Sequence, residues 1–142
     1  MKTYVLDTSV VLKWYNQEGE KEVEQALSLL DDLRKGTISI IVPNLLIIEL
    51  ANVLIKGKCL SVDDTKTLVT SFFSLPVINK EPNVEVMLRT ADICKTWGLT
   101  AYDSLYVATA QAEECQLISA DLNGHGKITD GTVVMLEHYR ST

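Results

Sequence analysis

The stretch YVLDTSVV, residues 4–11, places a carboxylate and two hydroxyls directly after a short apolar run. Residues 3–6 are mostly β-branched or aromatic, which is typical of a buried strand. Asp7, Thr8 and Ser9 then interrupt the apolar pattern, which resumes at once. Such side chains after a strand can form a turn, cap a helix or bind a metal ion.

The same alternation of short apolar runs and longer amphipathic ones continues along the chain. We expect strands over residues 3–6, 38–42, 77–78, 117–120 and 132–136. Apolar residues at helical spacing predict helices over residues 9–16, 20–34, 43–55, 61–73, 84–97 and 101–115. This order indicates an α/β fold, a three-layer α/β/α architecture with a central, mainly parallel sheet flanked by helices. No repeat or linker interrupts it, so we expect a single domain over residues 1–142.

Composition and charge argue against several classes of protein. The formal net charge of −6 disfavours a broad basic surface for duplex DNA. No apolar run approaches the roughly 20 residues that cross a bilayer, and we see no signal peptide, so no membrane association is expected. The cysteines Cys59, Cys94 and Cys115 are odd in number and form no CxxC pair. This favours a reducing, cytoplasmic location over a disulfide framework or a zinc site.

Four carboxylates lie where an apolar pattern is interrupted. Asp7 and Asp121 each follow a predicted strand, Asp103 opens a largely apolar helix, and Glu49 interrupts a helix that is apolar on every face and is therefore expected to be buried. Asn52, three residues after Glu49, shares its helix face and can orient it.

Each carboxylate also has a simple structural explanation. Asp7 can cap a helix, Asp103 fits a capping box that begins at Thr100, and Asp121 can belong to a turn. Glu49 can reach the surface or pair with a lysine.

Their combination is more informative than any one of them. Ligands of parallel α/β sheets bind outside the carboxyl ends of the strands, where all four acids can meet. Like charges that close repel unless a cation lies between them. Hard oxygen ligands select Mg²⁺ or Mn²⁺, so the pattern predicts a metal site.

Four segments together resemble the PIN domain and, more narrowly, the toxin ribonucleases of VapBC toxin–antitoxin pairs. They are DTSVVLKW (7–14), VPNLLIIELANVL (42–54), LTAYDSLYVATA (99–110) and LISAD (117–121). The resemblance implies a Mg²⁺- or Mn²⁺-dependent endoribonuclease that cleaves single-stranded RNA, forms a homodimer and is inhibited by a small antitoxin protein. Carried over by motif, the catalytic and metal-binding residues are Asp7, Glu49, Asp103 and Asp121, with a supporting hydroxyl from Thr8 or Ser9.

The end of the last motif departs from this family. Many relatives carry another acid and then an aromatic residue after the final aspartate, whereas here the chain continues Leu122-Asn123-Gly124-His125. Asn123 can bind a metal or water through its carbonyl oxygen, but without charge. The departure therefore bears on whether one or two metals bind.

Several other residues are candidates for binding RNA. No histidine is needed for metal-assisted hydrolysis, so we expect His125 and His138 at the surface. Basic residues near the site can contact the RNA backbone, with a solvated face as the alternative for each: Lys13, Lys56, Lys58 and Arg89. Aromatic residues that can stack on bases are Trp14, Tyr15 and Tyr102, although we expect Trp14 in the core.

Two other functions fit parts of the same pattern. A Mg²⁺-dependent phosphoryl-transfer protein, either a phosphatase or a receiver domain, also places an aspartate at a strand end. Ser9 stands where the phosphatase pattern needs a second aspartate, and no lysine closely follows LISAD as a receiver requires. A non-catalytic PIN-like binding module is the other alternative. The apolar residues of 43–55 and 68–73 can cover a subunit interface, and an antitoxin helix can dock in an apolar groove.

Overall fold

A parallel sheet forms the centre of the molecule. The computed structural model describes residues 1–141, and its strands pair in the order β3-β2-β1-β4-β5 with every pair parallel. The strands are β1 (Lys2–Leu6), β2 (Ile38–Pro43), β3 (Ile78–Lys80), β4 (Gln116–Ser119) and β5 (Val133–Met135). The central strand β1 thus pairs with β2 on one side and β4 on the other.

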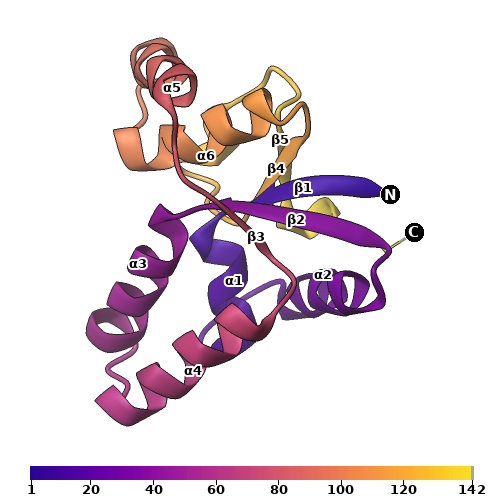
Figure 1. Ribbon diagram of the computed structural model, residues 1–142, viewed down its shortest axis with the longest axis vertical. Helices are drawn as coiled ribbons and strands as arrows, with labels where there is room; N and C mark the ends of the chain where they lie inside the picture. Colours follow the sequence, from indigo (N-terminus) through magenta and orange to yellow (C-terminus); the bar gives the residue numbers. More distant parts are fainter. Residues whose placement is uncertain (142) are drawn as a thin grey trace.

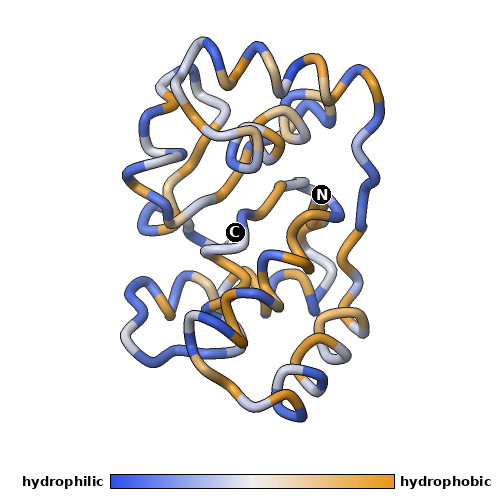
Figure 2. Tube along the Cα trace, turned by 90° about the vertical axis from the view of Figure 1, so that its left-hand side faces the viewer, coloured by the Kyte–Doolittle hydropathy of each residue, from blue (hydrophilic) through white to orange (hydrophobic). Residues whose placement is uncertain are grey.

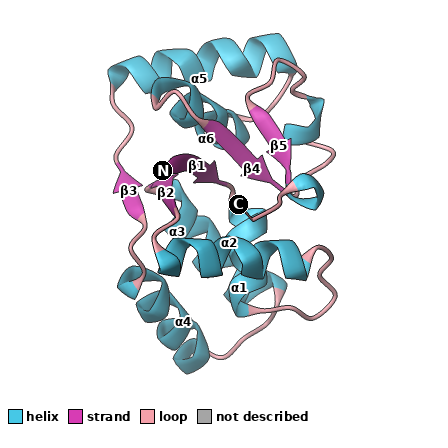
Figure 3. Cartoon of the chain, turned by 90° about the vertical axis from the view of Figure 1, so that its right-hand side faces the viewer, coloured by secondary structure: helices cyan, strands magenta, loops and turns pink. Residues whose placement is uncertain are grey.

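Helices cover both faces of this sheet (Figures 1 and 3). On one face lie α5 (Val84–Trp97) and α6 (Ala101–Ala112). On the other lie α1 (Thr8–Tyr15), α2 (Val23–Lys35), α3 (Leu45–Asn52) and α4 (Val62–Ser74). Crossovers between parallel strands are right-handed. The chain adds β2 and β3 on one side of β1 and then returns to add β4 on the other side. The helices of this return, α5 and α6, therefore lie on the opposite face of the sheet. The predicted three-layer α/β/α architecture is confirmed.

The helices begin and end where the sequence supplies capping groups. Asp7, Ser61, Asn83 and Thr100 are N-caps whose side chains accept a hydrogen bond from a backbone N–H in the first turn. Gly36 and Gly98 end α2 and α5 with φ of 74° and 69°, a conformation that favours glycine. The predicted bounds of α5 match those observed, and the other predicted helices differ mainly at their ends.

The predicted helix over 43–55 differs most from the observed structure. The α-helical part ends at Asn52, and a π-helical turn, η1 (Val53–Gly57), follows. The N–H of Lys58 donates to the carbonyl of Val53 at 2.8 Å, one residue further back than in an α-helix. The expectation that every face is buried is also wrong, because Ile48 is 67% exposed whereas Leu46 and Leu50 are fully buried.

The core lies between the sheet and its two helical layers. Figure 2 shows hydrophobic and hydrophilic residues interspersed along the helices, as in helices with one buried face. Tyr106, Ala108 and Ala110 of α6 are fully buried, and the small alanines let this helix pack closely on the sheet. Trp14 is buried as expected, and its indole N–H donates to the Ala26 carbonyl at 2.7 Å. None of the helices within residues 1–141 is long and apolar enough to cross a membrane.

A buried carboxylate attaches the end of the chain to α2. Asp32 is only 6% exposed, and its Oδ2 accepts hydrogen bonds from Tyr139 Oη at 2.5 Å and Ser141 Oγ at 2.8 Å. Burial and the neighbouring Asp32 raise the pKa of Tyr139, so its hydroxyl remains a donor at neutral pH. A buried carboxylate needs such donors to remain ionised at low cost.

We predict that Tyr139→Phe lowers the free energy of unfolding by about 1–3 kcal/mol, because it removes one of two donors to a buried carboxylate. Urea denaturation of the two proteins measures the difference. The control is Tyr102→Phe, at a 63% exposed position, which should change stability by less than about 0.5 kcal/mol. Equal effects of the two variants would contradict the assigned role of Asp32.

Candidate active site

The acids meet where the strand order reverses. From β1 the chain moves to β2 and β3 on one side, and β4 and β5 occupy the other side. Crevices form at such a reversal, outside the carboxyl ends of the strands. Asp7 directly follows β1, and Asp121 lies two residues after β4. The backbone N–H of Asp7 donates to the Ile118 carbonyl at 3.1 Å, which continues the strand pairing into the site.

Ser9 holds the Asp7 carboxylate against β4. Asp7 Oδ2 accepts hydrogen bonds from the Ser9 hydroxyl at 2.6 Å and from its backbone N–H at 3.1 Å. The same hydroxyl oxygen accepts the backbone N–H of Ala120 at 3.0 Å. One serine therefore fixes Asp7 relative to the chain that leads to Asp121.

Glu49 is held by two hydroxyl groups from distant segments. Its Oε1 accepts from Tyr106 Oη at 2.5 Å and from Thr8 Oγ1 at 3.0 Å, and these hydroxyls lie 2.8 Å from each other. Burial strongly raises the pKa of Tyr106, which keeps its hydroxyl protonated. Asn52 does not orient Glu49 as expected, because it is exposed and makes no hydrogen bond to Glu49 within residues 1–141.

Asp103 and Asp121 approach each other beside Gly124. Thr100 Oγ1 accepts the backbone N–H of Asp103 at 3.1 Å, and Asp121 Oδ1 accepts that of Gly124 at 3.0 Å. A Cβ atom added to Gly124 would lie 2.3 Å from Asp121 Oδ2 and 3.3 Å from Asp103 Oδ2. Only glycine therefore fits between these two carboxylates without displacing one of them.

The acids also share one electrostatic environment. Burial raises the pKa of Glu49, and the charges of Asp7 and Asp103 add to this effect, while hydrogen bonds from Tyr106 and Thr8 oppose it. Burial likewise raises the pKa of Asp103; the neighbouring His125 and the hydrogen bond with Thr100 oppose this, and repulsion from Asp7 and Asp121 adds to it. The structure therefore brings together the four acids singled out from the sequence.

The carboxylate oxygens of the four acids are the type of ligand that a hard divalent cation prefers. Asp7, Glu49 and Asp121 each use one oxygen in hydrogen bonds, and the second oxygen accepts none of those found within residues 1–141. As the side chains stand, no three His, Cys, Asp or Glu residues of this part of the chain converge closely enough to hold an ion. Like charges this close repel one another when no cation lies between them.

One sequence expectation about the last loop is wrong. His125 is fully buried rather than at the surface, because the loop after Asp121 folds back against α6 and both ring nitrogens make hydrogen bonds. His138 is exposed as expected. Asn123 is exposed and makes no hydrogen bond within the described residues. The contributions of Tyr106, Ser119 and Gly124 were missed, since no local pattern marks a long-range contact.

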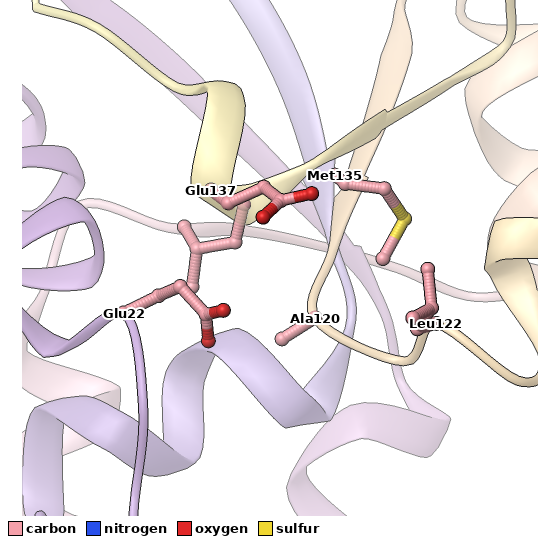
Figure 4. Close-up of a pocket in the computed structure, with 6 residues that line it drawn as sticks. Glu22, Ala120, Leu122, Met135 and Glu137 are labelled. Atoms are coloured by element: carbon pink, nitrogen blue, oxygen red, sulfur yellow. The ribbon is translucent and has the colours of Figure 1, made fainter.

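The basic candidates are mostly engaged elsewhere. Lys13 is buried and not on a solvated face, and it pairs with Glu20 at 2.9 Å. Lys58 pairs with the other oxygen of Glu20 at 2.9 Å, and Arg89 pairs with Glu85. The neighbouring hollow adds more negative charge, because the carboxylates of Glu22 and Glu137 border it beside Ala120 and Leu122 (Figure 4).

Comparison with known families agrees with this geometry. The PIN domain model matches residues 4–127, which include all four acids and the strands that position them. The chain belongs to the PIN domain family. No curated protein sequence matched this PIN domain.

Solved structures share the PIN fold of this chain. A toxin–antitoxin complex from Klebsiella pneumoniae matches with a TM-score of 0.69 and 16% identity over 94% of this chain and 97% of that one. DNA-bound VapBC from Salmonella typhimurium matches with a TM-score of 0.69 and 13% identity, over 96% of this chain and 99% of that one. Mycobacterium tuberculosis VapC20 is described as a sarcin–ricin loop cleaving toxin. It matches with a TM-score of 0.64 and 13% identity, over 82% of this chain and 87% of that one. At such identities these matches establish the fold.

We predict that Glu49→Gln stabilises this PIN domain by about 0.5–2 kcal/mol near pH 7 in the presence of EDTA. The amide oxygen can still accept from Tyr106 and Thr8, while the buried charge and its repulsion are removed. Because the folded-state pKa of Glu49 is raised, the wild type gains stability as the pH falls through that value. The difference in free energy of unfolding between Glu49→Gln and the wild type should therefore disappear near pH 4.3, approximately the ordinary glutamate pKa.

Urea denaturation across this pH range measures the effect. The matched control is Glu85→Gln, which removes an exposed carboxylate paired with Arg89 and should cost about 0.3–0.5 kcal/mol. A Glu49→Gln protein that is less stable than the wild type near pH 7 would contradict the electrostatic account.

Proposed function

We propose that this PIN domain is a metal-dependent endoribonuclease that hydrolyses phosphodiester bonds of single-stranded RNA, and that it is the toxin of a type II toxin–antitoxin pair. The observation that carries the proposal is the meeting of Asp7, Glu49, Asp103 and Asp121, from four separate segments, at the carboxyl edge of the sheet. Repulsion among acids is costly to the fold, and a role in binding a cation accounts for it.

We propose that these four acids hold Mg²⁺ or Mn²⁺. Such a cation would lower the pKa of bound water and neutralise charge that develops on the phosphate. The protein's own contribution is to orient the ligands: Ser9 holds Asp7, Gly124 holds Asp121, and Tyr106 with Thr8 holds Glu49. In each case one oxygen is fixed and the second remains available.

The charge distribution supports a substrate that is bound locally. The chain carries a net charge of −6, and Lys13, Lys58 and Arg89 are engaged in ion pairs. A duplex held along a basic surface therefore fits poorly, whereas a single strand that contacts the protein near the cation fits better. VapC20 is described as cleaving the sarcin–ricin loop, and an RNA substrate for this chain is part of our proposal.

We also propose a small antitoxin partner and a homodimer in the cytoplasm. Structures with the same fold include toxin–antitoxin and VapBC complexes. An apolar groove bordered by α3, α5 and the start of α6 contains Ile48, Met87 and Tyr102, which are 67%, 45% and 63% exposed. An apolar surface of this kind supports contact with a second chain.

The direct test is an RNA cleavage assay on the purified, partner-free protein. Labelled single-stranded and structured RNAs are incubated with Mg²⁺, Mn²⁺ or EDTA. We expect metal-dependent cleavage that falls more than about 100-fold in Asp7→Asn and Asp103→Asn, since loss of even an outer-shell partner commonly costs 10–100-fold. Asp92→Asn, an exposed substitution on α5, should retain activity.

Circular dichroism confirms beforehand that every variant is folded. A wild-type protein that binds Mn²⁺ yet cleaves none of the RNAs would overturn the ribonuclease proposal and favour a non-catalytic binding module. Cleavage that survives in EDTA, or in both aspartate variants, would overturn the assignment of the site.

We further predict that activity falls on acidification and that the half-maximal pH decreases when the MgCl₂ concentration is raised tenfold. Glu49 and Asp103 bind protons at a pH above their ordinary range, so protons compete with the cation for the same oxygens. Cleavage rates over a pH series at two MgCl₂ concentrations measure the shift. A half-maximal pH that is independent of MgCl₂ would contradict this competition.

A further inference from the structure

A buried histidine connects two of the acid-bearing segments. The His125 ring has no solvent exposure, and both of its nitrogens make hydrogen bonds. Nε2 lies 2.9 Å from the backbone oxygen of Asp103, and Nδ1 lies 2.8 Å from Ser119 Oγ. Ser119 Oγ in turn accepts the backbone N–H of Asp121 at 3.1 Å.

The direction of each hydrogen bond follows from the chemistry of the partners. A carbonyl oxygen can only accept, so Nε2 must carry a proton that it donates to Asp103. In the neutral ring Nδ1 is then the acceptor, and the Ser119 hydroxyl donates to it. The chain of donors runs from the Asp121 N–H through Ser119 and His125 to the Asp103 carbonyl, and every buried group in it is paired.

His125 has no access to a substrate, because it is fully buried and both nitrogens are occupied. It can act only through the residues that it connects. Its Nδ1 also lies 3.9 Å from Asp7 Oδ2, and its ring packs edge-on against Tyr106, the donor to Glu49. The ring therefore lies against Asp7 and Asp103 themselves, and against Ser119 and Tyr106, which bond Asp121 and Glu49.

We propose that His125 is a positioning residue that, with Ser119, sets the separation of Asp103 and Asp121 for cation binding. Its effect on cleavage rests on the proposed function, whereas its effect on the acids does not. A phenylalanine would fill the space but would leave the Ser119 hydroxyl and the Asp103 carbonyl without this link.

The first test reads the hydrogen bonds without activity. A long-range ¹H–¹⁵N NMR spectrum of the metal-free protein, labelled on histidine, reports which ring nitrogen carries the proton. We expect His125 to be the Nε2–H form, with that proton exchanging slowly with solvent. A proton on Nδ1 alone, or on both nitrogens near pH 7, would overturn the proposed network.

The second test measures what the network does. We compare His125→Phe, Ser119→Ala and the double variant for Mn²⁺ affinity by calorimetry and for kcat and KM on an RNA that the wild type cleaves. We expect each single variant to lose about 10–100-fold in Mn²⁺ affinity and in kcat, with KM for RNA nearly unchanged. The double variant should be no worse than the single ones, because both break one network.

Thr90→Val is the control for a merely structural effect. Thr90 is buried in α5, remote in sequence from the acids, and its hydroxyl donates to the Val86 carbonyl at 2.8 Å. It should reduce the unfolding temperature without changing Mn²⁺ affinity. Unchanged Mn²⁺ affinity in His125→Phe, or fully additive effects in the double variant, would overturn the positioning role. A wild type that binds Mn²⁺ but cleaves no RNA overturns the proposed function alone, since the NMR and affinity measurements still decide the role of His125.

Discussion

The pairing of β1 with β4 is the contact on which the site depends. The strand order reverses there, and two further hydrogen bonds extend the contact past the last paired residues: from the Asp7 N–H to the Ile118 carbonyl, and from the Ala120 N–H to the Ser9 hydroxyl. Two of the acids are consequently placed by the sheet and its immediate continuation. A site built on rigid strands can hold repelling charges that a mobile loop would let separate.

The acids have structural roles that serve the same arrangement. Asp7 caps α1, Asp103 belongs to the first turn of α6, whose N-cap is Thr100, and Asp121 accepts a backbone N–H in a tight turn. For Asp7 and Asp121 the structural bond fixes one carboxylate oxygen and leaves the other available. The simple structural explanation and the functional one are therefore compatible, and the first supplies the geometry that the second needs. The repulsion that remains lowers stability, as is common in active sites.

Much of this could be predicted from the sequence, because periodicity and strand ends are local features. Alternating strands and helices implied the parallel sheet, and the position of each acid relative to its element implied that they meet. The partners of Glu49 could not be predicted in this way. The helical spacing pointed to Asn52, whereas the observed partners, Thr8 and Tyr106, lie 41 and 57 residues away in the sequence. His125 was misplaced for the same reason, since its polar, glycine-rich surroundings concealed a long-range contact.

The distribution of charge implies an order of events at the proposed site. Glu20 pairs with both Lys13 and Lys58, so one carboxylate offsets part of the positive charge of two lysines. Within residues 1–141 no lysine or arginine pairs with the acids of the site, and Glu22 and Glu137 extend the negative region into the adjacent hollow (Figure 4). A polyanion that approached these acids without a cation would be repelled by them. Under the proposed function the cation therefore binds before RNA, and the negative field of the acids attracts it.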